Sequence, residues 1–121
     1  MAKPFTIYGI RNCDTMKKAR AWLDSHRVAY EFHDYKTSGI DNARLEGWAK
    51  KVGWETLLNM TGTTFRKLPD RDKTGMTEKK ALALMLAQPS MIKRPVIEFG
   101  SSKLMVGFKP EDYAKVFPRV R

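Results

Sequence analysis

The order of elements in the first 34 residues constrains the fold more than any other feature of the chain. Residues 4–9 (PFTIYG) are rich in aromatic and β-branched side chains, which is typical of a strand, and Gly9 ends this run. Residues 14–26 carry apolar side chains at helical spacing, and residues 28–34 (VAYEFHD) alternate as a second strand does. Because a helix connects the two strands, we expect them to be parallel, with a right-handed crossover.

A helical block follows these elements. Residues 38–92 carry apolar side chains at helical spacing, and the segment 81–87 (ALALMLA) is apolar almost all round. We therefore expect the helix at 81–87 to be deeply buried. Thr77 is a suitable N-cap for this helix, and Pro89 is placed to end it.

The last part of the chain predicts two strands and a short helix. Residues 95–99 (PVIEF) and 103–107 (KLMVG) are expected to form a β-hairpin, with Ser101 and Ser102 in its turn. Pro110 stands at a favourable first position of a closing helix. The complete order is therefore βαβ, a helical block, and ββα, and 121 residues fit a single domain with one hydrophobic core.

Composition and charge exclude several classes of protein. Apolar residues make up 42% of the chain, which is an ordinary globular composition, and no apolar run reaches the ~20 residues of a membrane span. The N-terminal sequence lacks the apolar stretch of a signal peptide, so we expect a cytoplasmic protein. The net charge of +10 favours anionic partners, but the basic residues are scattered, so we expect no specific nucleic-acid binding.

The chain contains one cysteine, Cys13, between the first predicted strand and the first predicted helix. Asn12 is a suitable N-cap residue and Asp14 suits the first turn, so Cys13 lies where the strand gives way to the helix N-terminus. Unpaired N–H groups and the helix dipole at such a position favour a thiolate, and the nearby Arg11, Lys17 and Lys18 would add to this effect. We therefore favour a reactive thiol over the alternative of a small buried hydrophobic residue.

Several mechanisms do not fit the residues around this cysteine. A C-x-x-C redox pair is absent because Met16 occupies the second position, and a C-x5-R phosphatase loop is absent because Ala19 replaces the arginine. His26 and His33 are the only candidates for a Cys–His pair; His26 is expected at the far end of the helix, and the position of His33 stays open. One cysteine and two histidines without ligand spacing predict no metal site.

Three motifs together resemble a known family: YGIRNC at residues 8–13, TTFRKL at 63–68 and IKRPVI at 92–97. In this order they are similar to the glutaredoxin-linked arsenate reductases and their relatives. The YffB proteins are the most similar branch, and the Spx-type transcriptional regulators are more distant. The resemblance implies a single thioredoxin-like domain over residues 1–121, with a mixed four-stranded sheet and a helical insertion at approximately 38–92.

The resemblance also implies functional residues. In the arsenate reductases one cysteine attacks arsenate, three arginines hold the oxyanion, and glutathione with glutaredoxin completes the reduction. By motif, the nucleophile falls on Cys13 and two arginines fall on Arg66 and Arg94. The third arginine is missing, because Lys109 occupies its position before Pro110.

The substrate-binding positions complete this expected site. We expect Asn12, Pro95 and Lys109 to contact the substrate. The thioredoxin-like resemblance further implies a cis peptide bond between Arg94 and Pro95, opposite Cys13.

Three functions are compatible with these residues. The first is a glutathione-dependent thiol/disulfide oxidoreductase that uses Cys13, with glutathione as co-substrate, no bound cofactor, and glutaredoxin as a further partner. The second is a glutaredoxin-linked arsenate reductase, for which we expect weak activity. The third is a non-enzymatic, Spx-like regulator that binds RNA polymerase; the missing C-x-x-C disfavours this one. We prefer the first function, with a small anionic or thiol substrate.

Overall fold

The structure is a computed structural model that describes residues 5–11, 13–99 and 103–116. The chain divides into two compact units. The first contains the segments Met1–Asp34 and Arg94–Arg121, and the second contains Tyr35–Lys93. The single domain expected over 1–121 stays a prediction, and each unit is described by itself. The predicted hairpin turn at Ser101 and Ser102 lies outside the described residues.

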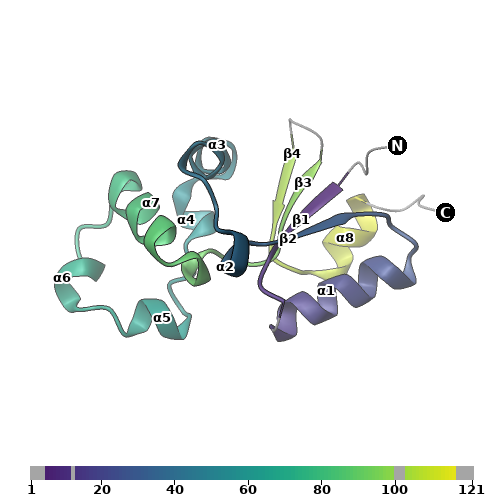
Figure 1. Cartoon of the computed structure of the whole chain (residues 1–121), viewed down its shortest axis with the longest axis horizontal. Helices are drawn as coiled ribbons and strands as arrows, with labels where there is room; N and C mark the ends of the chain where they lie inside the picture. Colours follow the sequence, from purple (N-terminus) through teal and green to yellow (C-terminus); the bar gives the residue numbers. More distant parts are fainter. Residues whose placement is uncertain (1–4, 12, 100–102, 117–121) are drawn as a thin grey trace. The chain divides into compact units, whose positions relative to one another are not determined.

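The first unit contains a four-stranded sheet (Figure 1). Its strands are β1 (Phe5–Gly9), β2 (Glu31–Asp34), β3 (Val96–Phe99) and β4 (Lys103–Val106), in the spatial order β2-β1-β3-β4. The β1 and β2 strands are parallel, whereas β3 is antiparallel to both β1 and β4. This mixed sheet, built from a βαβ half and a ββα half, confirms the predicted thioredoxin-like fold.

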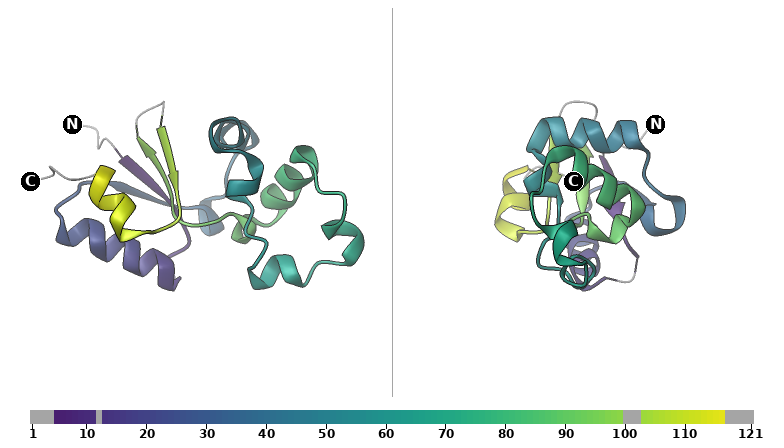
Figure 2. Two further views of the ribbon diagram at one scale, coloured as in Figure 1. Left: turned by 180° about the vertical axis from the view of Figure 1, so that it is seen from behind. Right: turned by 90° about the vertical axis from the view of Figure 1, so that its left-hand side faces the viewer.

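The helices α1 (Asp14–Ser25) and α8 (Pro110–Val116) pack on the same face of this sheet (Figures 1 and 2). Ile7 and Ile97 are register partners on β1 and β3. Both belong to the hydrophobic core that the two helices cover, together with Met16, Ala19, Leu23, Val28 and Tyr113. As predicted, α8 begins at Pro110.

The end of α1 explains why β2 is shorter than predicted. Arg27 has a left-handed backbone with φ 60°, and its N–H donates to the Asp24 carbonyl. The N–H of Val28 donates to the Leu23 carbonyl, and both side chains are buried in the core. These two hydrogen bonds form a Schellman motif that closes the helix. Val28 is therefore part of the helix end, and the strand begins only at Glu31.

The second unit is built from helices (Figure 2). Its range, 35–93, is close to the insertion predicted at approximately 38–92. As predicted, Thr77 is the N-cap of the helix that contains residues 81–87 and accepts a hydrogen bond from the Lys80 N–H. A 3-10 turn begins at Pro89 after this helix has ended. The elements are α2 (Tyr35–Ser38), α3 (Asn42–Val52), α4 (Trp54–Leu57), α5 (Thr63–Arg66), α6 (Asp70–Lys73), α7 (Glu78–Ala87) and η1 (Pro89–Met91).

The prediction that residues 81–87 are deeply buried is correct for only one side of the helix. In α7, Ala81, Leu82 and Met85 are buried, but Ala83 and Ala87 are exposed. The helix contacts α3, α4 and η1, and these neighbours leave part of its circumference uncovered. Small alanine side chains tolerate this exposure at little cost in free energy. Among the helices of the described ranges, none combines the length and the apolar character that a membrane span requires.

Candidate active site

Cys13 is itself the N-cap residue of α1. Its backbone is extended (φ −146°, ψ 131°), and its carbonyl accepts the first helical hydrogen bond, 2.9 Å from the Lys17 nitrogen. The prediction that Asn12 caps this helix is therefore wrong: helical dihedral angles begin only at Asp14, one residue later than such a cap requires. Asn12 lies outside the described residues, and its expected contact with substrate stays a prediction.

The close approach of α1 to the end of β1 sets the position of Cys13. A Cβ atom at Gly9 would lie 2.3 Å from the Met16 sulfur and 2.7 Å from the Met16 methyl carbon. Met16 is fully buried in the core beneath the first turn of the helix. Gly9 therefore allows the helix to start close to the strand end, and the sequence YGIRNC carries the chain from one to the other.

The Cys13 thiol lies next to Arg94, 81 positions away in the sequence. The Arg94 Nε atom donates a hydrogen bond to the Cys13 sulfur at 3.2 Å, and both residues are half-buried. Arg94 directly precedes Pro95, which is buried and leads into β3. The Arg94–Pro95 peptide bond is cis, which confirms the prediction made for this bond.

The surroundings of Cys13 lower its pKa below the ordinary value of a thiol. Burial raises the pKa, but the hydrogen bond and the positive charge of Arg94, together with the backbone N–H groups of Met16 and Thr15, outweigh this effect. These N–H groups lie at the start of α1, where the helix dipole also favours a thiolate. The direction agrees with the sequence prediction, but the cation is Arg94 rather than Arg11, Lys17 or Lys18.

The other predicted site residues differ in position. Arg66 is exposed at the end of α5 in the second unit, where its carbonyl accepts a hydrogen bond from the Lys73 ammonium at 2.6 Å. Lys109 is exposed, and its side chain forms no hydrogen bond or ion pair with any residue that the structure describes. Pro95 follows the arginine that contacts the thiol. The functional roles of Arg66 and Lys109 stay predictions.

The positions that other cysteine mechanisms require are filled by structural residues. Met16 stands at the position of the second cysteine of a redox pair, and Ala19 at the position of the arginine of a phosphatase loop. Both side chains are fully buried in the core. His26 caps the far end of α1, and a helix of 12 residues separates it from Cys13 by about 18 Å. His33 lies on β2, where its ring centroid is 5.0 Å from that of Tyr8.

One arrangement in the first unit was not predicted from the sequence. The guanidinium groups of Arg11 and Arg20 both lie against the ring of Phe32, with Cζ 5.2 Å and 4.6 Å from its centroid. The expected alternation of residues 28–34 could have placed Phe32 on the face of the sheet that the helix covers. The contact with two arginines depends on the packing of α1 against β2, which has no local signal.

Comparisons with known proteins give the family. The model of the ArsC family matches residues 8–116. A solved structure named YFFB protein is 58% identical, with a TM-score of 0.89 over 93% of this chain and 98% of that one. The solution structure of an arsenate reductase (ArsC) related protein from Brucella melitensis is 55% identical, with a TM-score of 0.79 over 98% of both chains.

Two curated relatives extend this comparison. An uncharacterized protein of Haemophilus influenzae is 38% identical over 93% of this chain and 97% of its own length. The global transcriptional regulator Spx of Streptococcus agalactiae is 28% identical over 94% of this chain and 83% of its own length. Since the family model matches nearly the whole chain, the protein belongs to the ArsC family of arsenate reductase-related proteins.

Proposed function

We propose that this protein is a glutathione-dependent thiol/disulfide oxidoreductase whose nucleophile is the Cys13 thiolate. The observation that carries this proposal is the hydrogen bond from Arg94 to the Cys13 sulfur, because it favours the thiolate at a half-exposed position. The chain has no second cysteine, so an external thiol must complete the cycle. We place this chemistry in the cytoplasm, where glutathione is abundant.

The reaction consists of two thiol–disulfide exchanges. In the first, the Cys13 sulfur attacks the glutathione sulfur of a glutathionylated substrate; a Cys13–glutathione disulfide forms, and the substrate leaves as a thiolate. In the second, a glutathione thiolate attacks the sulfur of the bound glutathione, which releases oxidised glutathione and regenerates the Cys13 thiolate. In total, the glutathionylated substrate and one reduced glutathione give the free substrate thiol and oxidised glutathione, so one glutathione thiol is oxidised while the substrate sulfur is reduced to a thiol.

Arg94 has two roles in this cycle. Before attack, its guanidinium stabilises the thiolate, and in the second exchange it stabilises Cys13 as the leaving group, since a thiol of low pKa leaves faster. Glutathione carries two carboxylates, and the net charge of +10 attracts them. Arg66, Lys109 and Pro95 are proposed to contact the bound peptide, and glutaredoxin to act as an additional reductant.

A coupled assay tests this function directly. The full chain is incubated with the mixed disulfide of glutathione and mercaptoethanol, and oxidised glutathione is measured through glutathione reductase. We expect turnover that disappears in Cys13→Ser and falls at neutral pH in Arg94→Gln, whereas Lys115→Gln, which removes an exposed charge on α8, retains it. Turnover that persists in Cys13→Ser would contradict the proposal.

Arsenate reduction is the second candidate function. The observation that favours it is Arg94 within hydrogen-bond distance of the nucleophilic sulfur, since a guanidinium there could also bind an oxyanion. Lysine at position 109 provides one point charge in place of a planar fork, so this activity should be weak. A lost bidentate contact to a developing charge costs about 2–4 kcal/mol, or roughly two to three decades of rate.

The substitution Lys109→Arg tests this second function. If an oxyanion site exists, arsenate turnover coupled to glutathione and glutaredoxin should rise from near background and vanish again with Cys13→Ser. Turnover that stays at background, while Cys13 still forms a glutathione adduct, would reject arsenate as a substrate and leave the thiol reductase as proposed.

A non-enzymatic role is the third candidate, because several relatives are global transcriptional regulators named Spx. The C-x-x-C position that would form a redox switch holds the buried Met16 in this chain. Binding to purified RNA polymerase without any turnover in the coupled assay would favour this role over the oxidoreductase.

A further inference from the structure

Two arginines of the first unit share one aromatic ring. Arg11 lies in the loop after β1, Arg20 lies on α1, and both guanidinium groups approach the Phe32 ring of β2, at 5.2 Å and 4.6 Å. Contact with the ring restricts both long side chains before any ligand binds. The three residues, which we call the Phe32 arginine pair, lie along the edge strand of the sheet.

Neither guanidinium of this pair forms an ion pair with a residue within the described ranges. Arg20 donates from Nε to the Tyr30 hydroxyl at 3.3 Å, and that hydroxyl donates to Asp24, so the neighbouring carboxylate is bound to tyrosine. Asp34 accepts from the backbone N–H of Arg11 rather than from its guanidinium. Both guanidinium groups thus retain donors for an external acceptor, and each can bind a carboxylate with two parallel hydrogen bonds.

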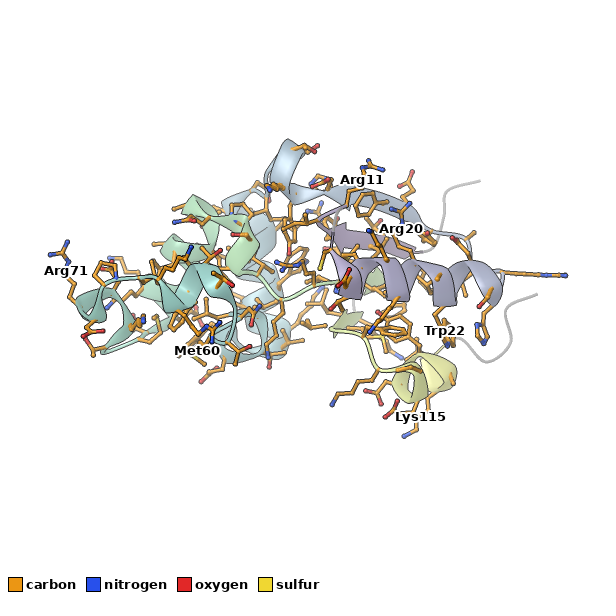
Figure 3. The ribbon with its side chains drawn as sticks, turned by 90° about the horizontal axis from the view of Figure 1, so that it is seen from below. Arg11, Arg20, Trp22, Met60, Arg71 and Lys115 are labelled. Carbon is orange, nitrogen blue, oxygen red and sulfur yellow. The ribbon has the colours of Figure 1, made fainter. Side chains whose placement is uncertain are left out.

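The pair lies on the same side of α1 as Cys13. Arg20 follows Cys13 by seven residues, which is two helical turns, so it lies on nearly the same face about 10.5 Å along the axis. Lys17 falls between them on this face and is exposed. Figure 3 shows Arg11 and Arg20 on one side of α1, with Trp22 on the other side toward α8. A basic surface therefore extends from the nucleophile along the helix.

A groove adjoins this surface. It has a volume of about 560 Å³ and is lined by residues of α1, β2 and the segment between them, among them Arg20, Tyr30 and Phe32. Asp24 and Glu31 also line the groove. These two carboxylates repel acidic groups, which disfavours an anionic ligand within the groove itself.

We propose that the Phe32 arginine pair is the docking surface for an acidic segment of a protein that presents its disulfide to Cys13. This inference rests on the proposed function and names its substrate class. Two arginines at one ring can each bind one carboxylate of an extended acidic segment, in which residues two apart point to the same side.

The proposal is tested by comparing the rates at which Cys13 exchanges with an acidic and with a neutral disulfide peptide. The probes are two extended ten-residue peptides, each with one cysteine as a mixed disulfide with thionitrobenzoate; one has two glutamates after the cysteine, and the other has glutamines there. Attack by Cys13 joins the peptide sulfur to Cys13 and releases yellow thionitrobenzoate. The full chain is compared with Arg11→Gln/Arg20→Gln and with a control, Lys18→Gln/Lys115→Gln, that loses the same charge from exposed residues elsewhere.

We expect the wild-type chain to react with the acidic peptide about tenfold faster than with the neutral one at low ionic strength, with an advantage that shrinks as salt is added. In Arg11→Gln/Arg20→Gln the ratio should fall to about twofold or less while the neutral peptide reacts unchanged, and the control should keep the wild-type ratio. Equal rates in the wild type, or an equal loss in the control, would overturn the proposal.

A cysteine-free acidic peptide separates this proposal from the proposed function. In an NMR titration of the wild-type chain, it should shift the backbone amide signals of Arg11, Arg20 and Phe32. If neither disulfide peptide reacts, the oxidoreductase function fails, and these shifts still decide whether the docking surface exists. Without shifts at these residues, the surface binds no acidic segment.

Discussion

Replacing Gly9 by alanine tests how the structure holds Cys13 in place. The added Cβ would meet the Met16 sulfur at 2.3 Å and its methyl carbon at 2.7 Å, far inside van der Waals contact. Met16 is fully buried in the core, so the flexible end of its side chain must shift among packed neighbours to make room. Forcing an extra carbon into a packed core costs about 1–3 kcal/mol, so we expect Gly9→Ala to lower the free energy of unfolding by this amount.

A double-mutant cycle separates this contact from other effects of alanine. Met16→Ala alone should cost about 2–5 kcal/mol, because it leaves a cavity. In the Met16→Ala background the extra cost of Gly9→Ala should disappear, which gives a coupling energy of about 1–3 kcal/mol. Gly47→Ala is the control: it lies inside α3 with no atom near its added Cβ, so alanine should stabilise by roughly 0.5–1 kcal/mol.

The assay is urea unfolding followed by NMR, read at the amides of β1 and α1 for the Gly9 and Met16 variants of the first unit, and at the amides of α3 for Gly47→Ala in the second unit. The reasoning is refuted if Gly9→Ala changes the stability of these elements by less than about 0.5 kcal/mol, the range of an ordinary surface substitution. It is also refuted if Gly9→Ala costs the same with and without the Met16 side chain.

Three further predictions concern single residues. Arg94→Gln should raise the pKa of Cys13, seen as a higher inflection in the pH dependence of iodoacetamide alkylation; an unchanged inflection would exclude Arg94 as the cause. Arg27→Gly should stabilise the first unit by roughly 1 kcal/mol, since Arg27 occupies the left-handed position of a Schellman motif, and urea unfolding would show no gain if the motif is absent. Burial raises the pKa of Tyr113, so on raising the pH its absorbance should change only after that of exposed tyrosines. Because the unfolded phenol ionises above about pH 10 while the folded one stays neutral, the free energy of unfolding of the first unit should be unaffected by this group below that pH and should decrease as the pH rises above it. A first unit that is equally stable at pH 9 and pH 11 would contradict this.

Local sequence patterns predicted the elements that frame the site. The aromatic and β-branched run before Gly9, the helical spacing from Asp14, and Pro110 at a helix start each depend on interactions within a few residues. Their type and order were therefore correct. The start of β2 was missed because Arg27, a residue without a turn preference, adopts the left-handed conformation that glycine usually supplies.

The contacts that make the site reactive depend on residues far apart in the chain. Cys13 and Arg94 are separated by 81 positions, and only the order of the sheet, with β3 beside β1, brings them together. The resemblance to the arsenate reductases singled out both residues, whereas spacing alone favoured cations close to Cys13. The shared ring of Arg11 and Arg20 was not foreseen, because helix packing against an edge strand leaves no periodic signal.

The most direct test of the central claim is the intact mass of the protein after incubation with oxidised glutathione at neutral pH. We predict one glutathione adduct per chain, absent from Cys13→Ser, formed more slowly by Arg94→Gln, and removed completely by reduced glutathione. A chain that stays unmodified by oxidised glutathione, while a generic disulfide reagent labels Cys13 readily, would show that the thiol is reactive but that glutathione is not its partner.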